Sequence, residues 1–503
     1  MRRTLVAALM FALAATAAPA HAAVDRPVPA PVPTQPSLVL DRAEAALDGR
    51  VPGDHRPEAT LALRDLFVSL PALRGDDRAH AERILARPTD GNQDPYGDGY
   101  KARSTRKCSD TICVHRVKRT ADKASGRFAS TTLRVLKKVW RAEVGRLGYR
   151  RPVKDGRLGG RGGKFDVYLK ELGSQGLYGY CAPEYRVRDH PRLANAYCVL
   201  DNDFARSQYG GKPVDTLRVT AAHEFFHAIQ FGYDYREDPW LMEATATWIE
   251  ERFADDVNDN RQYLREGQVR LTHVPLDTFD RDRSFQYGNW TFFEYLSMRF
   301  GNGVVKRIWK GAGELRGDGG KYSLQAVRRA LPDRVSLPDL YARYAAANAT
   351  PGRSYPEGSS WPTPDWAGGG RLGRGDVASG RVRISHLAAH HFRLTPEAEL
   401  DRSRFRLKVS VDGPARKTSP RMVLVRLTPG GDVVTTEVAL DKAGEGSATV
   451  PFNTLRTERL FAVAVNASTR FECGSHGTRY SCRGKPRDER KLFALRFKVV
   501  SRR

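Results

Sequence analysis

Residues 220–229 read Thr-Ala-Ala-His-Glu-Phe-Phe-His-Ala-Ile, and they contain the pattern HExxH. On an α-helix, positions i and i+4 lie on one face a turn apart, so His223 and His227 can reach the same cation. Glu224 lies next to that face, where its carboxylate can contact a metal-bound water without binding the metal itself. The other residues are uncharged, which favours a buried helix over a surface helix whose histidines merely pair or cap. The stretch therefore predicts a metal-binding helix, with zinc as the expected ion.

A third ligand has to come from outside this helix, because a catalytic zinc takes three protein ligands and a water. Residues 239–246 predict a second helix, with Asp238 as N-cap and Pro239 in the first helical position. Glu243 lies in its first turns among apolar residues, where a metal would neutralise a carboxylate that is costly to bury. Thr247, one turn later, could donate a hydrogen bond to a histidine or to that carboxylate.

Other residues compete for the third position. The extended metzincin motif HExxHxxGxxH needs a histidine at position 233, which is Tyr233 here, so that arrangement is excluded. Glu250 shares a face with Glu243 but lies two turns further along the helix, and it ranks second. The remaining alternatives are Asp234, Glu237 and Glu251.

These stretches carry a family resemblance. HEFFH followed by WLMEATA resembles the gluzincin pattern HExxH…WLxExxA of thermolysin-like peptidases and zinc aminopeptidases. Residues 223–248 are more closely similar to the run HE[FY]FHAxQFGY…WLMEATATW of a group of secreted predicted metalloproteases of actinobacteria and myxobacteria. The stretches YLKELGSQGLYGYC (168–181) and YCVLDND (197–203) fit the same group, so the resemblance covers roughly residues 90–350.

The resemblance implies a fold and a site. It implies a zincin-like domain of the α+β class, one catalytic Zn²⁺ held by His223, His227 and Glu243, and Glu224 as the general base. Gluzincin-like enzymes often supply a tyrosine before a helix to stabilise the oxyanion, and Tyr287 stands at such a place. Simple packing at a helix start explains Tyr287 equally well.

Two departures from the family pattern bear on the site. The spacing from His227 to Glu243 is shorter than in the best-known gluzincins. Members of the closer group often carry an acidic DxDxDG loop of the calcium type, whereas residues 118–125 read KRTADKAS, which argues against calcium at that point. The strand expected at residues 197–200 is predicted to form the edge of the cleft, where an extended peptide could add as a strand.

The N-terminal part of the chain divides into two segments. Residues 1–22 read as an export signal, with two arginines, an apolar run and the cleavage site Ala20-His21-Ala22. Residues 23–90 hold a Pro-rich linker followed by helical patterns, which form either a pro-region that is later removed or a stable N-terminal cap.

The rest of the chain predicts two domains. Residues 91–350 alternate strand and helix patterns and form the zincin-like domain, with Ser130 as the expected N-cap of a helix that reaches residue 147. Residues 351–373 are rich in Pro, Gly and Ser and are interpreted as a linker. Residues 374–503 alternate with period two, which predicts a C-terminal β-sandwich domain.

The six cysteines fall into three local couples. None of them has the C-x-x-C spacing of a zinc thiolate site, and pairing between sequence neighbours closes the shortest loops. We therefore expect three disulfides and a secreted, extracellular protein. The couples are Cys108/Cys113, Cys181/Cys198 and Cys473/Cys482.

The formal net charge is +25. Such an excess favours anionic surfaces such as cell-wall polymers, although a solvated arginine-rich surface explains it as well. The cations are scattered without interleaved aromatic residues, which argues against nucleic acid as a partner, and no later segment is long enough for a membrane span. His386 and His390 repeat the histidine spacing, but they lack the glutamate and lie among strand patterns, which favours packing or a surface role.

The expected function is therefore zinc-dependent hydrolysis of protein or peptide substrates outside the cell, with Glu224 as general base. The alternative is an envelope-binding protein with a structural or inactive zinc site and a basic β-sandwich that holds anionic cell-wall polymer. A third possibility is a zinc hydrolase that acts on peptidoglycan cross-links.

Overall fold

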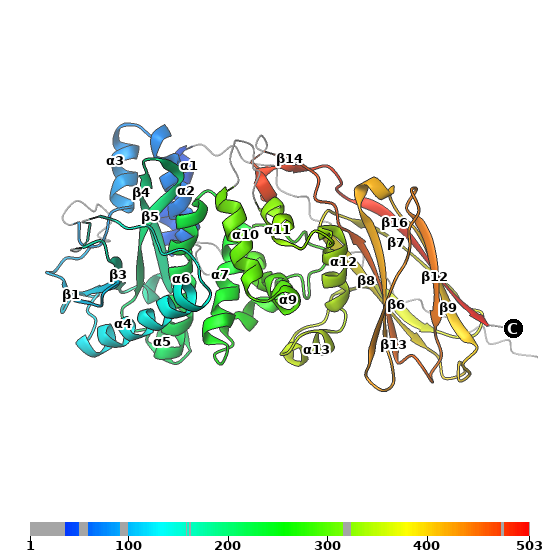
Figure 1. Ribbon diagram of the computed structural model, residues 1–503. Helices are drawn as coiled ribbons and strands as arrows, with labels where there is room; N and C mark the ends of the chain where they lie inside the picture. The colour runs from blue at the N-terminus through cyan, green and yellow to red at the C-terminus, as the bar shows by residue number, and fades with distance from the viewer. Residues whose placement is uncertain are drawn as a thin grey trace, which may run out of the picture. The chain divides into compact units, whose positions relative to one another are not determined.

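The computed structural model describes residues 36–49, 59–90, 99–156, 158–159, 162–314, 323–473 and 477–501. The predicted export signal at 1–22 and most of the Pro-rich linker lie outside the described residues. The described part has a mixed α+β architecture, in which helices and a five-stranded sheet precede a C-terminal region of β-sheets (Figure 1). No helix within that part is long and apolar enough to cross a membrane.

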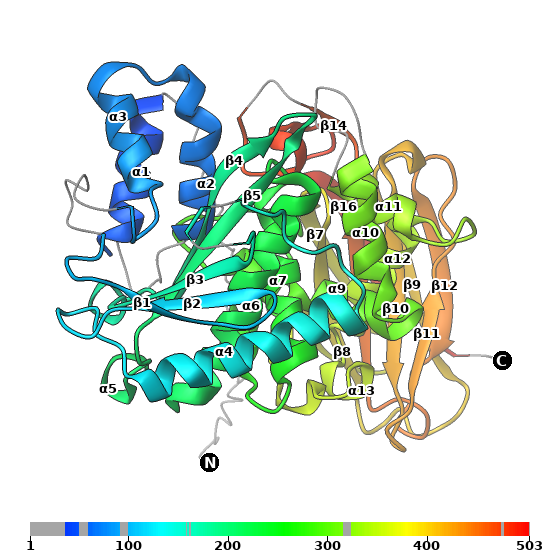
Figure 2. The same ribbon diagram turned by 60° about the vertical axis from the view of Figure 1, so that its left-hand side comes forward.

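Three helices form the N-terminal segment, as the sequence predicts: α1 (Pro36–Leu47), α2 (Ala59–Ser69) and α3 (Gly75–Ile84). Helix α2 buries most of its side chains, and Leu63 and Leu66 have no exposed surface. Figure 2 shows α2 beside strand β4 (Gly179–Val187), and the two elements pack against each other. The helical segment is thus packed onto the central sheet.

The central sheet has the strand order β1-β2-β3-β5-β4. Strands β2, β3 and β5 run parallel to one another, whereas β1 and β4 are antiparallel to their neighbours. Every residue of β3 is buried, as expected for a strand with both faces covered. The remaining strands are β1 (Thr105–Cys108), β2 (Ile112–Arg116), β3 (Phe165–Lys170) and β5 (His190–Asp201).

The prediction that residues 197–200 form the cleft edge is wrong, because β5 lies inside the sheet. Strand β4 pairs antiparallel with β5 and covers its outer side, with Tyr180 opposite Val199. Gly179 and Pro183 weaken the strand pattern of β4 in the sequence, and proline is tolerated mainly on edge strands. The edge strand of the sheet on this side is therefore β4.

The helix after β2 begins earlier than predicted. Helix α4 spans Gly126–Trp140, and its N-cap is Ser125, whose side chain accepts a hydrogen bond from the Phe128 N–H at 2.9 Å. Ser130 lies inside the helix and donates to the Gly126 carbonyl at 2.8 Å, so its predicted capping role is wrong. A π-helical turn, Arg141–Arg146, continues the helix.

Two long helices form the centre of the mixed region. Helix α6 (Pro213–Asp234) packs against β5 and β4, and helix α7 (Pro239–Ala254) packs against α6. Asp238 is the N-cap residue of α7 and Pro239 its first residue, as predicted, although the Asp238 carboxylate accepts from the Cys482 N–H instead of its own helix. The helices that follow are α8 (Phe285–Gly288), α9 (Trp290–Phe300), α10 (Gly303–Glu314), α11 (Leu324–Ala330), α12 (Leu337–Ala347) and α13 (Pro351–Ser354).

The C-terminal region contains two packed sheets with the orders β11-β10-β13-β8-β6 and β12-β9-β16-β7. Strand β6 (Trp366–Leu372) lies in the segment that the sequence suggested as a linker, and it pairs parallel with β8. The other strands are β7 (Val377–Ile384), β8 (Ala388–Pro396), β9 (Phe405–Asp412), β10 (Pro420–Leu427), β11 (Val433–Glu437), β12 (Glu445–Pro451), β13 (Arg459–Asn466) and β16 (Lys491–Ser501).

The five-stranded sheet of the C-terminal region, β11-β10-β13-β8-β6, is covered on both faces. One face packs against the other sheet around residues such as Leu424 and Phe497, and the opposite face packs against α12 through residues such as Val463. His386 is fully buried at this junction and pairs with Asp277 at 2.8 Å, which agrees with a packing role.

Three disulfides join the cysteines in the predicted pairs, Cys108–Cys113, Cys181–Cys198 and Cys473–Cys482. The second one crosses the β4–β5 hairpin between directly opposed residues. Disulfides persist mainly in oxidising compartments, so the three bridges fit an extracellular protein.

Candidate metal centre and its cleft

Helix α6 places the two histidines of the HExxH stretch one turn apart on one face. Their Nε2 atoms lie 3.1 Å from each other. His227 is 1% exposed, whereas the His223 side chain keeps 11% of its surface open to a pocket. The helix thus directs two imidazole nitrogens toward one point in the core.

Glu243 comes from α7 and completes the group. Its side chain is fully buried, with Oε2 3.3 Å from His223 Nε2 and Oε1 3.4 Å from His227 Nε2. The three ligand atoms all lie within 4.8 Å of one another, and neither carboxylate oxygen has a hydrogen-bond partner. A buried carboxylate without hydrogen bonds is costly, so this donor set fits a cation such as zinc.

The alternative third ligands have other partners. Glu250 contacts the far nitrogen of His223, with Oε1 2.7 Å from Nδ1. Asp234 pairs with Arg192 at 2.7 Å. Glu237 accepts from the Asp238 N–H, and Glu251 accepts from the Asn260 amide. Of the five candidates, the structure brings only Glu243 to the Nε2 atoms of both histidines.

Gln230 orients His227, a role that was not predicted from the sequence; the only signal for it is its position three residues further along the same helix. Its Oε1 lies 2.7 Å from His227 Nδ1, while its Nε2 donates to the Met242 carbonyl at 2.9 Å and to Thr245 Oγ1 at 3.2 Å. An amide oxygen can only accept, so Nδ1 carries the hydrogen and Nε2 presents its lone pair to the centre.

Thr247 does not make either contact suggested for it. Its hydroxyl donates to the backbone carbonyl of Glu243 at 3.0 Å, one turn back in the same helix. This is the usual local bond of a helical threonine. Glu250 and Gln230 therefore take the positioning role expected of Thr247.

The two histidine rings and Glu243 shift one another's pKa values. Burial by itself lowers the pKa of both histidines. At His223 the carboxylates of Glu243 and Glu250 outweigh this effect, and at His227 the carboxylate of Glu243 does, so the pKa of each ring is raised above 6.5. Burial raises the pKa of Glu243, yet the two rings pull it below its ordinary value of 4.5. Protons and a metal ion thus compete for the same imidazole nitrogens.

Glu224 lies beside the histidines and reaches the pocket. It is 7% exposed, and burial raises the pKa of its carboxyl above 4.5. Thr60 of α2 donates to Glu224 Oε2 at 3.0 Å. Gly179 lies against the same side chain, and a Cβ atom there would come within 3.0 Å of Glu224 Cγ and 2.9 Å of the Val199 carbonyl. Glycine is therefore needed for β4 to approach the base.

Tyr287 lies at the site, as predicted. Its ring stacks on His223 with a centroid distance of 5.9 Å and on Tyr263 with a distance of 5.0 Å. It lines a pocket of about 190 Å³ together with His223 and Glu224. Three further carboxylates line this pocket, those of Glu250, Asp259 and Glu266, and no lysine or arginine does.

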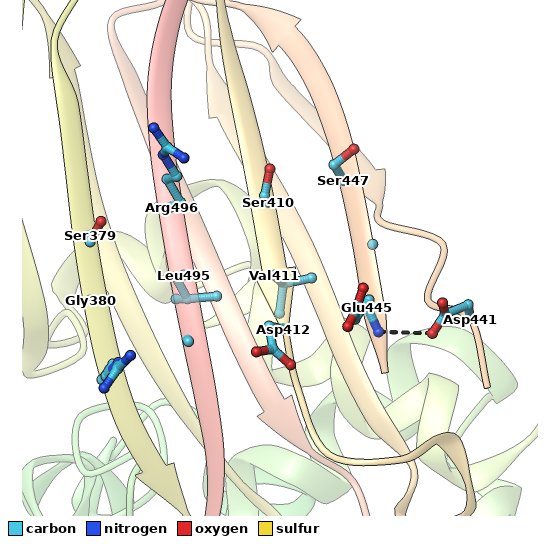
Figure 3. A pocket seen from close by; sticks show the side chains of 13 residues that line it. Ser379, Gly380, Ser410, Val411, Asp412, Asp441, Glu445, Ser447, Leu495 and Arg496 are labelled. Atoms are coloured by element: carbon cyan, nitrogen blue, oxygen red, sulfur yellow. Dashed lines mark hydrogen bonds between the residues drawn. The ribbon is translucent and has the colours of Figure 1, made fainter. Parts of the chain in front are cut away.

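A second acidic group and a surface hollow lie outside the group formed by His223, His227 and Glu243. The second acidic group consists of Glu251, Asp255 and Glu357, but Arg252 and Arg261 form ion pairs with two of its members. The outer face of the sheet β12-β9-β16-β7 has a hollow of about 730 Å³ (Figure 3). Its charged lining consists of Arg381, Arg496, Asp412, Asp441 and Glu445, so it is not a basic groove for an anionic polymer.

No family model and no curated protein sequence matches the chain. Among solved structures, it is similar to the pre-peptidase C-terminal domain of collagenase from Bacillus anthracis, with 9% sequence identity and a TM-score of 0.16. The match covers 26% of this chain and 94% of that domain.

Proposed function

We propose that the protein is a secreted zinc-dependent metallopeptidase of the zincin type. The observation that supports this most directly is the convergence of His223, His227 and Glu243, with a buried carboxylate that has no other partner. Three protein ligands leave one position open, which is typical of catalytic zinc sites, whereas structural sites use four. Zinc bound there would lower the pKa of its water toward 7 and polarise the scissile carbonyl.

The residues of the chain have separate roles in this proposal. Glu224 takes the proton of the attacking water and passes it to the leaving amine. Gln230 and Glu250 hold the two imidazole rings by their Nδ1 atoms. The Tyr287 hydroxyl is the candidate donor to the developing oxyanion, because its ring stands beside His223 at the pocket wall.

Metal analysis combined with a peptide-cleavage assay tests the proposal. We expect one zinc per chain in the purified protein and hydrolysis of a mixed pool of peptides. Glu224→Gln should keep the zinc and lose roughly 10²- to 10⁴-fold in rate, the usual contribution of a general base. Asp256→Asn is the control, since this carboxylate is exposed and paired with Arg218. Full activity of Glu224→Gln, or protein without zinc, would refute the proposal, and zinc without hydrolysis would favour a binding protein.

A further inference from the structure

The outer edge of β4 decides how a peptide can bind, because a chain that adds to a sheet needs free backbone groups there. Cys181 and Cys198 oppose each other with Cα atoms 4.0 Å apart, the spacing of a pair that exchanges no backbone hydrogen bonds. The backbone groups of Cys181 therefore point away from β5. Those of Gly179 and Pro183, two residues to either side, point the same way.

Beyond Gly179 the N–H groups of β4 that could face a bound peptide are used or missing. The Cys181 N–H donates to Thr60 Oγ1 at 3.0 Å. Pro183 has no N–H, and past the bulge the Tyr185 N–H donates back to the neighbouring strand, to Asn195 Oδ1 of β5 at 2.9 Å. Along this strand, only the Gly179 end keeps an outward amide that a bound peptide could use.

Helix α2 lies along the closed part of the edge. Its Thr60 sits at Cys181, and at the other end its Phe67 carbonyl accepts from Arg186 at 3.5 Å. The helix is firmly anchored: Arg64 is 1% exposed and donates to the Tyr235 and Glu237 carbonyls at 3.1 and 2.9 Å. The next residue of the helix, Asp65, forms ion pairs with Arg281 and Arg483, which are distant in the sequence.

The same threonine marks the boundary of the open pocket. Thr60 bonds both the edge amide of Cys181 and the carboxylate of Glu224. The pocket lies on the other side of Glu224. Residues 176–179 line it, so Gly179 is the only residue of β4 in its lining. The base thus stands between an open side and a side filled by α2.

We infer that α2 is a fixed wall of the cleft and that the intact chain is an exopeptidase, which removes residues only from the end of a peptide. The inference rests on the proposed function. Hydrolysis of an internal bond requires the substrate chain to continue past Glu224 in both directions. On the side of Cys181 this continuation meets α2 and finds no edge amide to pair with, so the substrate has to end there.

Product analysis tests the inference on the intact, zinc-loaded chain. A pool of linear peptides of known sequence is digested, and the new ends are identified by mass spectrometry. Loss of one or two residues from one end of the peptides is the expected result. Internal fragments as the main early products would overturn the inference. Absence of any hydrolysis would overturn both the proposed function and the exopeptidase assignment.

A second measurement, which does not depend on enzymatic activity, tests whether α2 closes the edge of β4. Hydrogen exchange of the Cys181 amide should be slow in the intact chain and at least tenfold faster in Thr60→Val, which removes both hydrogen bonds of this hydroxyl. The control is Thr132→Val, a buried helical threonine that bonds only within α4. Rapid exchange of the Cys181 amide in the unaltered chain would refute the inference that α2 closes this side of the cleft, whatever the protein hydrolyses. The two measurements therefore separate failure of the wall from failure of the proposed function.

Discussion

Replacement of Gln230 by leucine should weaken metal binding without rebuilding the site. Leucine has a similar volume but cannot accept from His227 Nδ1, whose hydrogen would then be buried without a partner. An orphaned buried polar group costs about 1–3 kcal/mol. Loss of a group that orients a metal ligand typically lowers affinity about 10- to 100-fold, which corresponds to roughly 1.4–2.8 kcal/mol.

The assay for Gln230→Leu is competition for zinc with a chelator of known affinity, alongside urea unfolding of the metal-free protein. Gln268→Leu is the matched control, because Gln268 is also buried and donates to the Val274 and Leu387 carbonyls, neither of which belongs to a predicted ligand. Both variants should lose folded stability, but only Gln230→Leu should lose zinc affinity. Equal zinc affinity of Gln230→Leu and the unaltered protein would refute the assigned role of Gln230.

Three further predictions follow from the charges and packing. Zinc affinity should fall as the pH is lowered, because both histidine rings of the centre have raised pKa values and must lose protons to bind metal; calorimetry in buffers of different ionisation enthalpy should detect the released protons. Burial opposes the charged form of His386, but Asp277 outweighs it and raises its pKa from 6.5 to about 9. The stability from this pair is complete below pH 6.5 and lost as the pH rises through 9, so urea unfolding should show a loss of about 3 kcal/mol from this group. Gly179→Ala should lower peptide hydrolysis more than it lowers zinc content, because the added Cβ pushes on Glu224 and not on the ligands.

The part of the site that depends on local spacing was predictable. One turn of helix fixes His223 relative to His227, and a carboxylate among apolar residues at the start of a helix predicts Glu243 as a metal ligand. Neither argument uses contacts between distant segments. The same is true of the three disulfides, which join cysteines close in the sequence.

The parts that depend on tertiary contacts were not predictable. Thr60 precedes Glu224 by 164 residues, and nothing near either residue indicates that they meet. The edge of the sheet is β4 and not residues 197–200, and the glycine and proline of β4 weaken its strand pattern in the sequence. The helix start is at Ser125 instead of Ser130, because two serines lie five residues apart and only the folded backbone shows which one caps the Phe128 N–H.

The packing around the centre bears on the choice between a catalytic and a structural metal. A structural zinc supplies folding energy that the protein otherwise lacks. Here the ligands lie on α6 and α7, which are buried among large side chains such as Trp240 and Trp248, so the helices have a core without a metal. The predicted ligands thus lie on helices whose packing does not depend on an ion, which favours the proposed catalytic role over a structural one.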